Sequence, residues 1–177
     1  MLEKLILEIN AIQKNRLTDV TISKNRLSFK DGPPTKSNGL YWIYTDHTDL
    51  ELLQSTSSSQ RGALNFCSLV ERNRSGNHCC KEAVDGFRIV YSGIGGVGQK
   101  NEGGLRERIL QEFRGGEGTG SLAIAKSSVL DFSRWKVSFV LWDEIDALRE
   151  RYSYYPFATA VEGLWRLHFG WPMLCSK

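Results

Sequence analysis

The sequence predicts an α+β domain in which a small mixed or antiparallel sheet of about three core strands is flanked by helices. Apolar residues recur at helical spacing over residues 2–14 and 103–113, while aromatic and β-branched runs cover 39–45, 87–92 and 135–142. After a leading helix, the core elements therefore follow as strand, strand, helix, strand and helix. This order does not alternate regularly enough for a doubly wound parallel sheet.

The length of 177 residues indicates one domain, residues 1–177. Apolar residues make up 41% and charged residues 24%, as is ordinary for a soluble protein, and the net charge of +3 is mild. No apolar run reaches the roughly 18 residues that cross a bilayer. Glu3 and Glu8 interrupt the apolar N-terminal stretch, which makes it a poor signal peptide. We therefore expect a cytoplasmic protein without a membrane partner.

Residues 1–38 form an N-terminal extension ahead of the core. Leucine and isoleucine recur every three or four residues from Leu2 to Ile12, which predicts a helix. The sequences "DVTIS" and "RLSF" are typical of short strands, and "DGPPTKSNG" is typical of a turn-rich connector. The first core strand, "GLYWIYT", follows at residues 39–45.

A long polar stretch, residues 46–86, separates the first two core strands. It contains the low-complexity sequence "QSTSSSQ", so we expect a loop-like insertion that could contact DNA. The second core strand is "FRIVYS", residues 87–92.

Helical and extended patterns complete the core after the second strand. "GGLRERILQEF", residues 103–113, predicts an amphipathic helix, and "WKVSFVLW", residues 135–142, predicts the third strand. "DEIDALRERY", residues 143–152, is expected to begin a helix because acidic residues fill its first turn. A last helix runs from Pro156 to Phe169, before Pro172.

The run "GIGGVG", residues 93–98, satisfies the dinucleotide pattern G-x-G-x-x-G. Its context is poor, because "QKNEGG" separates it from the next helix and no acidic strand end follows at the expected distance. A P-loop fails as well, since no Lys-Ser or Lys-Thr pair follows the glycines. We interpret Gly93 as a turn residue after a strand that ends at Tyr91, and keep nucleotide binding as a lesser alternative.

The cysteines Cys67, Cys79, Cys80 and Cys175 form no recognisable disulfide framework. Cys79 and Cys80 follow His78, but a zinc site would call for ligand spacing such as C-x-x-C. Reduced thiols are the favoured interpretation.

Two phenols, an arginine and a carboxylate could form one chemical set. Tyr41 and Tyr91 lie on strands that reach one surface if they pair, and the helix beyond brings an arginine beside them. Arginine stabilises charge on a phosphate, a carboxylate binds a hard divalent cation, and a phenol can accept a proton from water. These groups suit phosphodiester hydrolysis.

Four short sequences resemble those of the GIY-YIG nuclease superfamily. "GLY" at 39–41 and "YSG" at 91–93 are similar to its paired signature. "LRERI" at 105–109 resembles its first helix, and "EGLW" at 162–165, followed by Pro172, resembles its late helix. The resemblance implies a β-β-α-β-α core and a metal-dependent endonuclease that cuts DNA with one divalent cation, usually Mg²⁺, or another such as Mn²⁺.

The resemblance also implies roles for individual residues. Tyr41 takes or relays the proton of the attacking water, and Tyr91 assists. Arg108 is the match to the catalytic arginine, with Arg106 as the alternative. Glu162 would bind the metal, although Arg166 at i,i+4 offers another explanation for its charge, just as Glu112 does for Arg108.

Four features depart from the family's pattern. The second signature has Ser92 at its middle position. Residues 46–86 are an unusually long insertion between the paired signatures. Glu112 stands where the family often has His or Tyr, and Cys175 stands near a frequent asparagine.

DNA is the partner that the resemblance implies, and contacts to its phosphates come mainly from arginine and lysine. The candidate contact residues are Lys100, Arg106, Arg61, Arg72 and Arg74. A compact restriction-type enzyme is one role that fits, and symmetric cleavage would favour a homodimer. The main alternative is a DNA-binding module of the same fold without catalytic activity.

Overall fold

The structure is a computed structural model that describes residues 2–23, 26–76, 78–96, 104–116, 118, 120–148 and 155–176. Within them the chain is α+β, as predicted, but the sheet has six strands rather than about three. The strands are β1 (Thr18–Ser23), β2 (Arg26–Phe29), β3 (Gly39–Thr45), β4 (Ala83–Val84), β5 (Phe87–Gly95) and β6 (Trp135–Leu141). Neighbouring strands are antiparallel in the order β2-β1-β6-β3-β5-β4. The N-terminal extension thus adds two strands to the sheet: β1 pairs with β6, and β2 pairs with β1.

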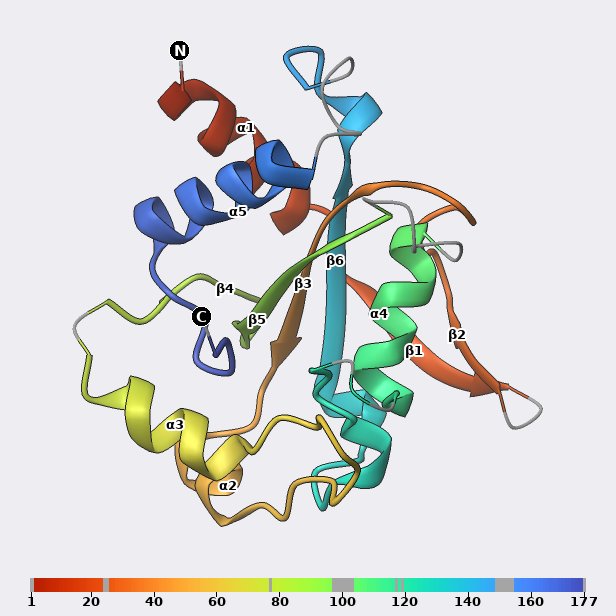
Figure 1. Cartoon of the computed structure of the whole chain (residues 1–177), viewed down its shortest axis with the longest axis vertical. Helices are drawn as coiled ribbons and strands as arrows, with labels where there is room; N and C mark the ends of the chain where they lie inside the picture. The colour runs from red at the N-terminus through yellow and green to blue at the C-terminus, as the bar shows by residue number, and fades with distance from the viewer. Residues whose placement is uncertain are drawn as a thin grey trace.

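Helices cover both faces of the sheet. α1 (Leu2–Lys14) and α5 (Tyr155–Phe169) lie next to each other, and α4 (Gly104–Arg114) lies apart from them on the other side of β3 (Figure 1). Trp42 belongs to the apolar core on the α1 and α5 face, and Ile43 to the core on the α4 face. β3 therefore has buried side chains on both faces, as its uninterrupted aromatic and β-branched sequence requires.

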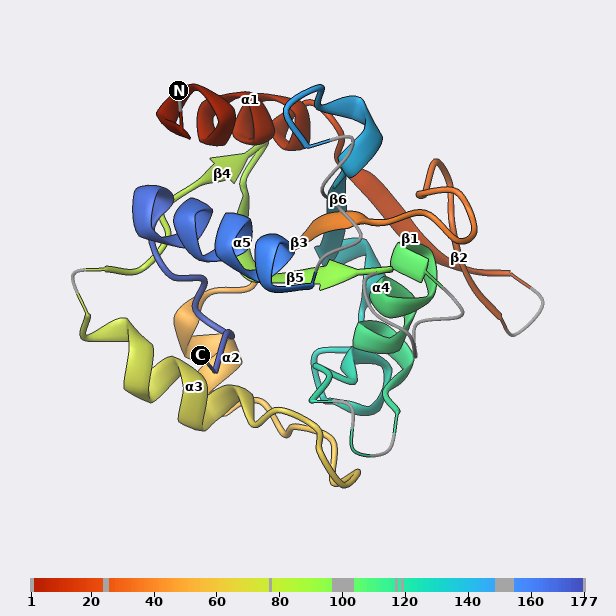
Figure 2. The ribbon, with the colours of Figure 1, turned by 45° about the horizontal axis from the view of Figure 1, so that its top comes forward.

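The insertion is not the loop that its composition suggested. It contains α2 (Asp49–Gln54) and α3 (Phe66–Arg74), which lie together at one end of the molecule (Figure 2). Thr48 caps α2 with a complete capping box, and the Asn65 side chain caps α3. Phe66, with its neighbours Leu69 and Val70, is buried at helical spacing. This short apolar pattern is the signal that the polar composition masked.

The helix expected from residue 143 is wrong over the residues that the structure describes. A 3-10 turn, Trp142–Glu144, follows β6, and Ile145 is extended. Trp142, Ile145 and Leu148 are all buried, and backbone hydrogen bonds join each to the next. A spacing of three residues suits successive tight turns rather than an α-helix. The rest of this stretch, residues 149–152, lies outside the described residues.

Gly93 is also not a turn residue, because β5 continues to Gly95. Gly93 is directly opposite Tyr41 in β3, and a Cβ at this position would lie 2.4 Å from the Tyr41 ring. A Cβ on Gly95 would lie 2.6 Å from the Leu105 Cα. Both glycines therefore allow close packing on a strand, one of a tyrosine ring and the other of helix α4.

Among the described residues, no helix is both long enough and apolar enough to span a bilayer.

Candidate active site

A cavity of about 240 Å³ lies beside β5 and contains every residue predicted to be catalytic. Its lining residues are Tyr41, Tyr91, Ser92, Gly93, Ile94, Arg108, Glu162 and Arg166. They come from β3, β5, α4 and α5. β4 pairs only with the first residues of β5, so farther along this strand side chains from both faces of the sheet can converge at its edge.

Tyr41 is fixed from two sides. Its ring lies over Gly93, where a larger residue would collide with it, and its centroid is 6.2 Å from that of Tyr91. The Tyr41 hydroxyl donates a hydrogen bond of 2.7 Å to Oε1 of Glu112. Tyr44, three residues along β3, belongs to the core on the opposite face of the sheet.

Glu112 is the residue that connects the tyrosines to the arginine. It is fully buried, and its Oε1 also lies 2.7 Å from Nη2 of Arg108. The Leu122 backbone N–H donates to Oε2 at 2.8 Å, and the Tyr91 hydroxyl interacts with the same carboxylate. The sequence indicates Glu112 as a departure from the family's pattern and as an i,i+4 partner for Arg108. Its contacts with the two tyrosines are visible only in the structure.

The surroundings keep both phenols protonated at rest. Burial, reinforced by the charge of Glu112, raises the pKa of Tyr41 and of Tyr91 well above the ordinary value. Burial also raises the pKa of Glu112, against the opposing effect of Arg108. Burial alone would lower the pKa of Arg108, but Tyr41 and Glu112 outweigh it and the pKa is raised. Arg108 is therefore a permanent cation in the wall of the cavity.

Glu162 approaches the cavity from α5. Its side chain and that of Arg166 are each 12% exposed, and Arg166 Nη2 lies 2.6 Å from Glu162 Oε1. The Ser92 hydroxyl donates to the same oxygen at 3.2 Å. The i,i+4 ion pair considered from the sequence is thus present. Burial raises the pKa of Glu162 above its ordinary value, although Arg166 opposes the shift.

The side chains around this cavity would suit a magnesium ion that keeps most of its water ligands, rather than an ion bound by protein ligands alone. Among the described residues, no group of three or more His, Cys, Asp or Glu side chains could hold a metal. Mg²⁺ commonly keeps several waters and binds one or two carboxylates together with substrate phosphates. The hydrogen bonds from Ser92 and Arg166 to Glu162 both fall on Oε1, so Oε2 is the oxygen that would suit such an ion.

The predicted DNA-contacting residues that the structure describes do not line this cavity. Arg106 donates to the Pro33 carbonyl at 3.1 Å and lies over the Phe29 ring, which joins α4 to β2. Arg72 donates to the carbonyls of Cys175 and Ser176 and so holds the C-terminal segment.

The other predicted contacts differ from these two. Arg61 and Arg74 are exposed on the insertion, and Lys100 lies outside the described residues. DNA contact stays a prediction for all five candidate residues.

Within the described part of the chain, the glycine run forms no nucleotide-binding loop and the cysteines form no metal site. Gly93 and Gly95 pair within the sheet instead of forming a loop, and Gly98 lies outside the described residues. All four cysteines are free thiols. The Cys175 sulfur accepts a hydrogen bond from the Ser92 backbone at 3.4 Å and thereby closes the edge of β5 beside the cavity.

Comparison of the chain with protein-family models, curated proteins and solved structures finds no match.

Proposed function

We propose that this protein is a metal-dependent endonuclease that hydrolyses phosphodiester bonds in DNA. The observation that carries the proposal is the convergence of Tyr41, Arg108 and Glu162 on one cavity. A phenol can move a proton, a fixed guanidinium can stabilise charge on a phosphate, and a carboxylate can hold a divalent cation. The three residues belong to three separate elements, β3, α4 and α5, so their proximity does not follow from local sequence.

The order of elements supports the proposal. β3, β5, α4, β6 and α5 follow one another along the chain, and β3 lies between β5 and β6. This is the β-β-α-β-α order that the GIY-YIG resemblance implies, with residues 46–86 inserted between the first two strands. A restriction-type role and a homodimer belong to the same proposal.

Arg108 would neutralise the charge that builds up on the phosphate in the transition state. Its planar guanidinium stays charged at every working pH and is already held by Glu112 and the tyrosines. Because these groups fix it before substrate arrives, little reorganisation is needed during the reaction.

Tyr41 would relay a proton from the attacking water to Glu112. As the water oxygen bonds to phosphorus, its proton passes to the Tyr41 oxygen, and the original phenol proton passes to Glu112 Oε1 along the existing 2.7 Å hydrogen bond. The bond from phosphorus to the leaving oxygen then breaks. One proton leaves the water and one arrives on Glu112, so Tyr41 ends as it began. The raised pKa of Glu112 suits it to accept this proton.

Glu162 would hold the divalent cation through Oε2. When bound, Mg²⁺ would supply Lewis-acid stabilisation of charge on the phosphate and the leaving oxygen. Ser92 and Arg166 orient the carboxylate by their contacts with Oε1.

Plasmid cleavage tests the proposal. The purified protein is incubated with supercoiled DNA and Mg²⁺, in parallel with Glu162→Gln, Arg108→Ala and Tyr41→Phe. Each variant is expected to lose at least about 100-fold in rate. Glu107→Gln is the matched control, because this α4 glutamate pairs with Arg114 at the surface and does not line the cavity.

The outcomes separate the alternatives. Cutting by the wild type and by Glu107→Gln, but not by the other variants, supports the nuclease. Full activity in Glu162→Gln would overturn it. DNA binding without cleavage by the wild type would identify a catalytically inactive binding module instead.

A further inference from the structure

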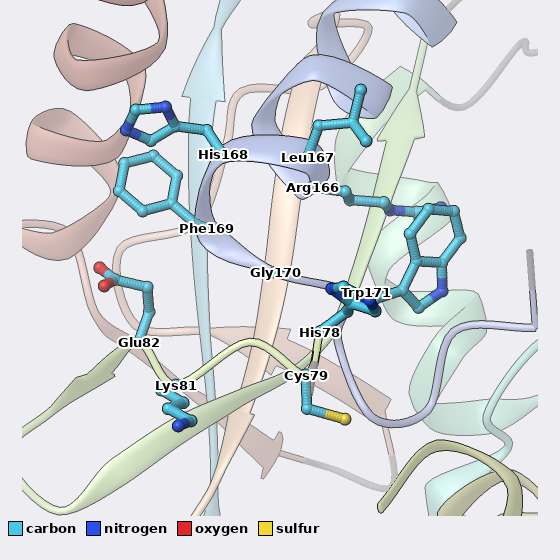
Figure 3. A pocket seen from close by; sticks show the side chains of 10 residues that line it. All are labelled: His78, Cys79, Lys81, Glu82, Arg166, Leu167, His168, Phe169, Gly170 and Trp171. Atoms are coloured by element: carbon cyan, nitrogen blue, oxygen red, sulfur yellow. The ribbon is translucent and has the colours of Figure 1, made fainter. Parts of the chain in front are cut away.

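A second and larger cavity, of about 720 Å³, adjoins the candidate active site. Figure 3 shows it between the segment from His78 to Glu82, at the end of the insertion, and the last turn of α5 with Trp171. A volume of this size is typical of sites for small organic ligands. Nothing in the nuclease proposal above uses it.

Backbone contacts hold the two walls of the second cavity together. Cys80 N donates to the Trp171 carbonyl at 2.9 Å, and Trp171 N donates to the His78 carbonyl at 2.6 Å. Gly170 has a φ of +98°, and a Cβ there would lie 2.7 Å from Cys80 N. The insertion therefore packs directly against the end of α5, and the cavity is a built feature of the fold.

The lining suits an anion that carries an aromatic group. Lys81 and His168 contribute exposed basic side chains, and Arg166 adds a cation. The negative charge of Glu82 is compensated by an ion pair with Lys14, and the Asn10 side chain donates a hydrogen bond of 3.0 Å to the same carboxylate. The Arg166 charge is paired with Glu162, so the exposed Lys81 supplies the positive charge that lies near an aromatic ring.

Trp171 is the tryptophan that a ligand can reach within the described part of the chain. Four of the five tryptophans, Trp42, Trp135, Trp142 and Trp165, are fully buried. Trp171 is half-buried, lines the cavity and has the Arg166 guanidinium 4.8 Å from its ring centroid. A half-exposed tryptophan beside cationic side chains is the arrangement on which single-stranded nucleic acids stack their bases.

Arg166 connects the two cavities. Its guanidinium contacts Glu162 and donates to the Ser92 carbonyl at 3.1 Å inside the candidate active site, while its other side faces Trp171. A DNA strand with its scissile phosphate at Arg108 and Glu162 would therefore continue into the second cavity.

We infer that the second cavity binds the nucleotide next to the scissile phosphate, with its base stacked on Trp171 and its phosphate facing Lys81. The inference rests on the proposed nuclease function. A base can stack on Trp171 only when it is outside the duplex stack, and extrusion costs least for an unpaired base. The preferred DNA therefore has an unpaired nucleotide beside the cut.

Intrinsic tryptophan fluorescence tests this without cleavage. A short single-stranded oligothymidylate, titrated in EDTA, is expected to quench the wild type, and a duplex of equal length much less. Trp171→Phe should abolish the quenching but keep the affinity, measured by anisotropy of a labelled strand. Trp171→Leu should weaken binding about tenfold, and Lys81→Ala several-fold. Lys30→Ala, an exposed lysine after β2, should bind as the wild type does.

The results keep the two proposals apart. Unchanged affinity in both Trp171→Leu and Lys81→Ala, or absence of quenching in the wild type, would overturn the nucleotide site even if plasmid is cut. Quenching and the expected losses of affinity would support the site even if no plasmid is cut. Circular dichroism of each variant guards against misfolding, and should Trp171→Leu not fold, Trp171→Phe and Lys81→Ala decide.

Discussion

Arg108 and Glu112 are a buried ion pair whose partners depend on each other. Glu112 is fully buried and has contacts to Arg108, Tyr41 and the Leu122 N–H, so its charge and its hydrogen-bonding capacity are both compensated. Removal of one member of a buried pair is costly, because the other charge stays behind without compensation.

Glu112→Ala is therefore expected to lower the free energy of unfolding by about 3 kcal/mol. In the double variant Arg108→Ala with Glu112→Ala, no buried charge is left over, and part of the loss should be recovered. Urea denaturation of the single and double variants measures both effects. Additive losses in the double variant would contradict the pairing.

The rate of cleavage should depend on the ionisation of Glu112. Only the ionised carboxylate of Glu112 can accept the proton from Tyr41. Cleavage should therefore be fast at pH values above the pKa of Glu112, and its rate should fall as the pH is lowered through that pKa. Burial raises this pKa above the ordinary 4.5, so the acidic limb of the pH profile lies above that value.

Glu162 has a pKa raised by burial as well, so two carboxyl groups contribute to this limb. Magnesium separates them, because the cation competes with protons only at Glu162. Higher Mg²⁺ should move the Glu162 contribution to lower pH and leave that of Glu112 in place. If the whole acidic limb of the pH profile moves with the Mg²⁺ concentration, Glu112 does not accept the proton.

Gly93 and Gly163 both lie next to the candidate site, but they differ in the space around them, because one is in a strand and the other is in a helix. Gly93 lies within β5, under the Tyr41 ring, whereas Gly163 lies within α5 with nothing within 4 Å of where its Cβ would stand. A side chain at position 93 would disturb the packing of Tyr41, whereas a small side chain at position 163 would meet no obstacle.

Gly93→Ala should displace Tyr41, lower stability by about 1–3 kcal/mol and reduce cleavage. Gly163→Ala should raise stability by about 0.5–1 kcal/mol, because alanine is the better helix former. Thermal unfolding of both variants measures the difference. A Gly93→Ala protein as stable and active as the wild type would show that Tyr41 is not held by this contact.

At the scale of the whole molecule, the fold is stabilised by apolar cores on the two faces of the sheet. Among the described residues, no group of three or more His, Cys, Asp or Glu side chains could hold a metal. We therefore expect EDTA to abolish plasmid cleavage while the unfolding temperature stays unchanged within error. A large fall in the unfolding temperature would point to a structural metal instead, and undiminished cleavage in EDTA would contradict the role of Glu162.

The elements of the core could be predicted from the sequence alone. The helix over residues 2–14 and the strand over 39–45 are confirmed with their expected bounds as α1 and β3, because apolar periodicity and β-branched runs are local signals. The insertion was misjudged, since its polar composition outweighed the short apolar pattern of α3. The turn after β6 was misjudged because acidic residues suggested a helix start, while burial of Ile145 and Leu148 required a tighter spacing.

The candidate residues Tyr41, Tyr91, Arg108 and Glu162 could also be predicted from the sequence, from their chemical types and their positions in short motifs. The tertiary structure decided that they share one cavity, that Glu112 joins them, and that Arg106 faces away. The physical reason is that secondary structure follows from neighbours within a few residues, whereas the site depends on contacts such as Tyr41 with Glu112, 71 residues apart. Only the register of β3 against β5 and the docking of α4 and α5 bring such groups together.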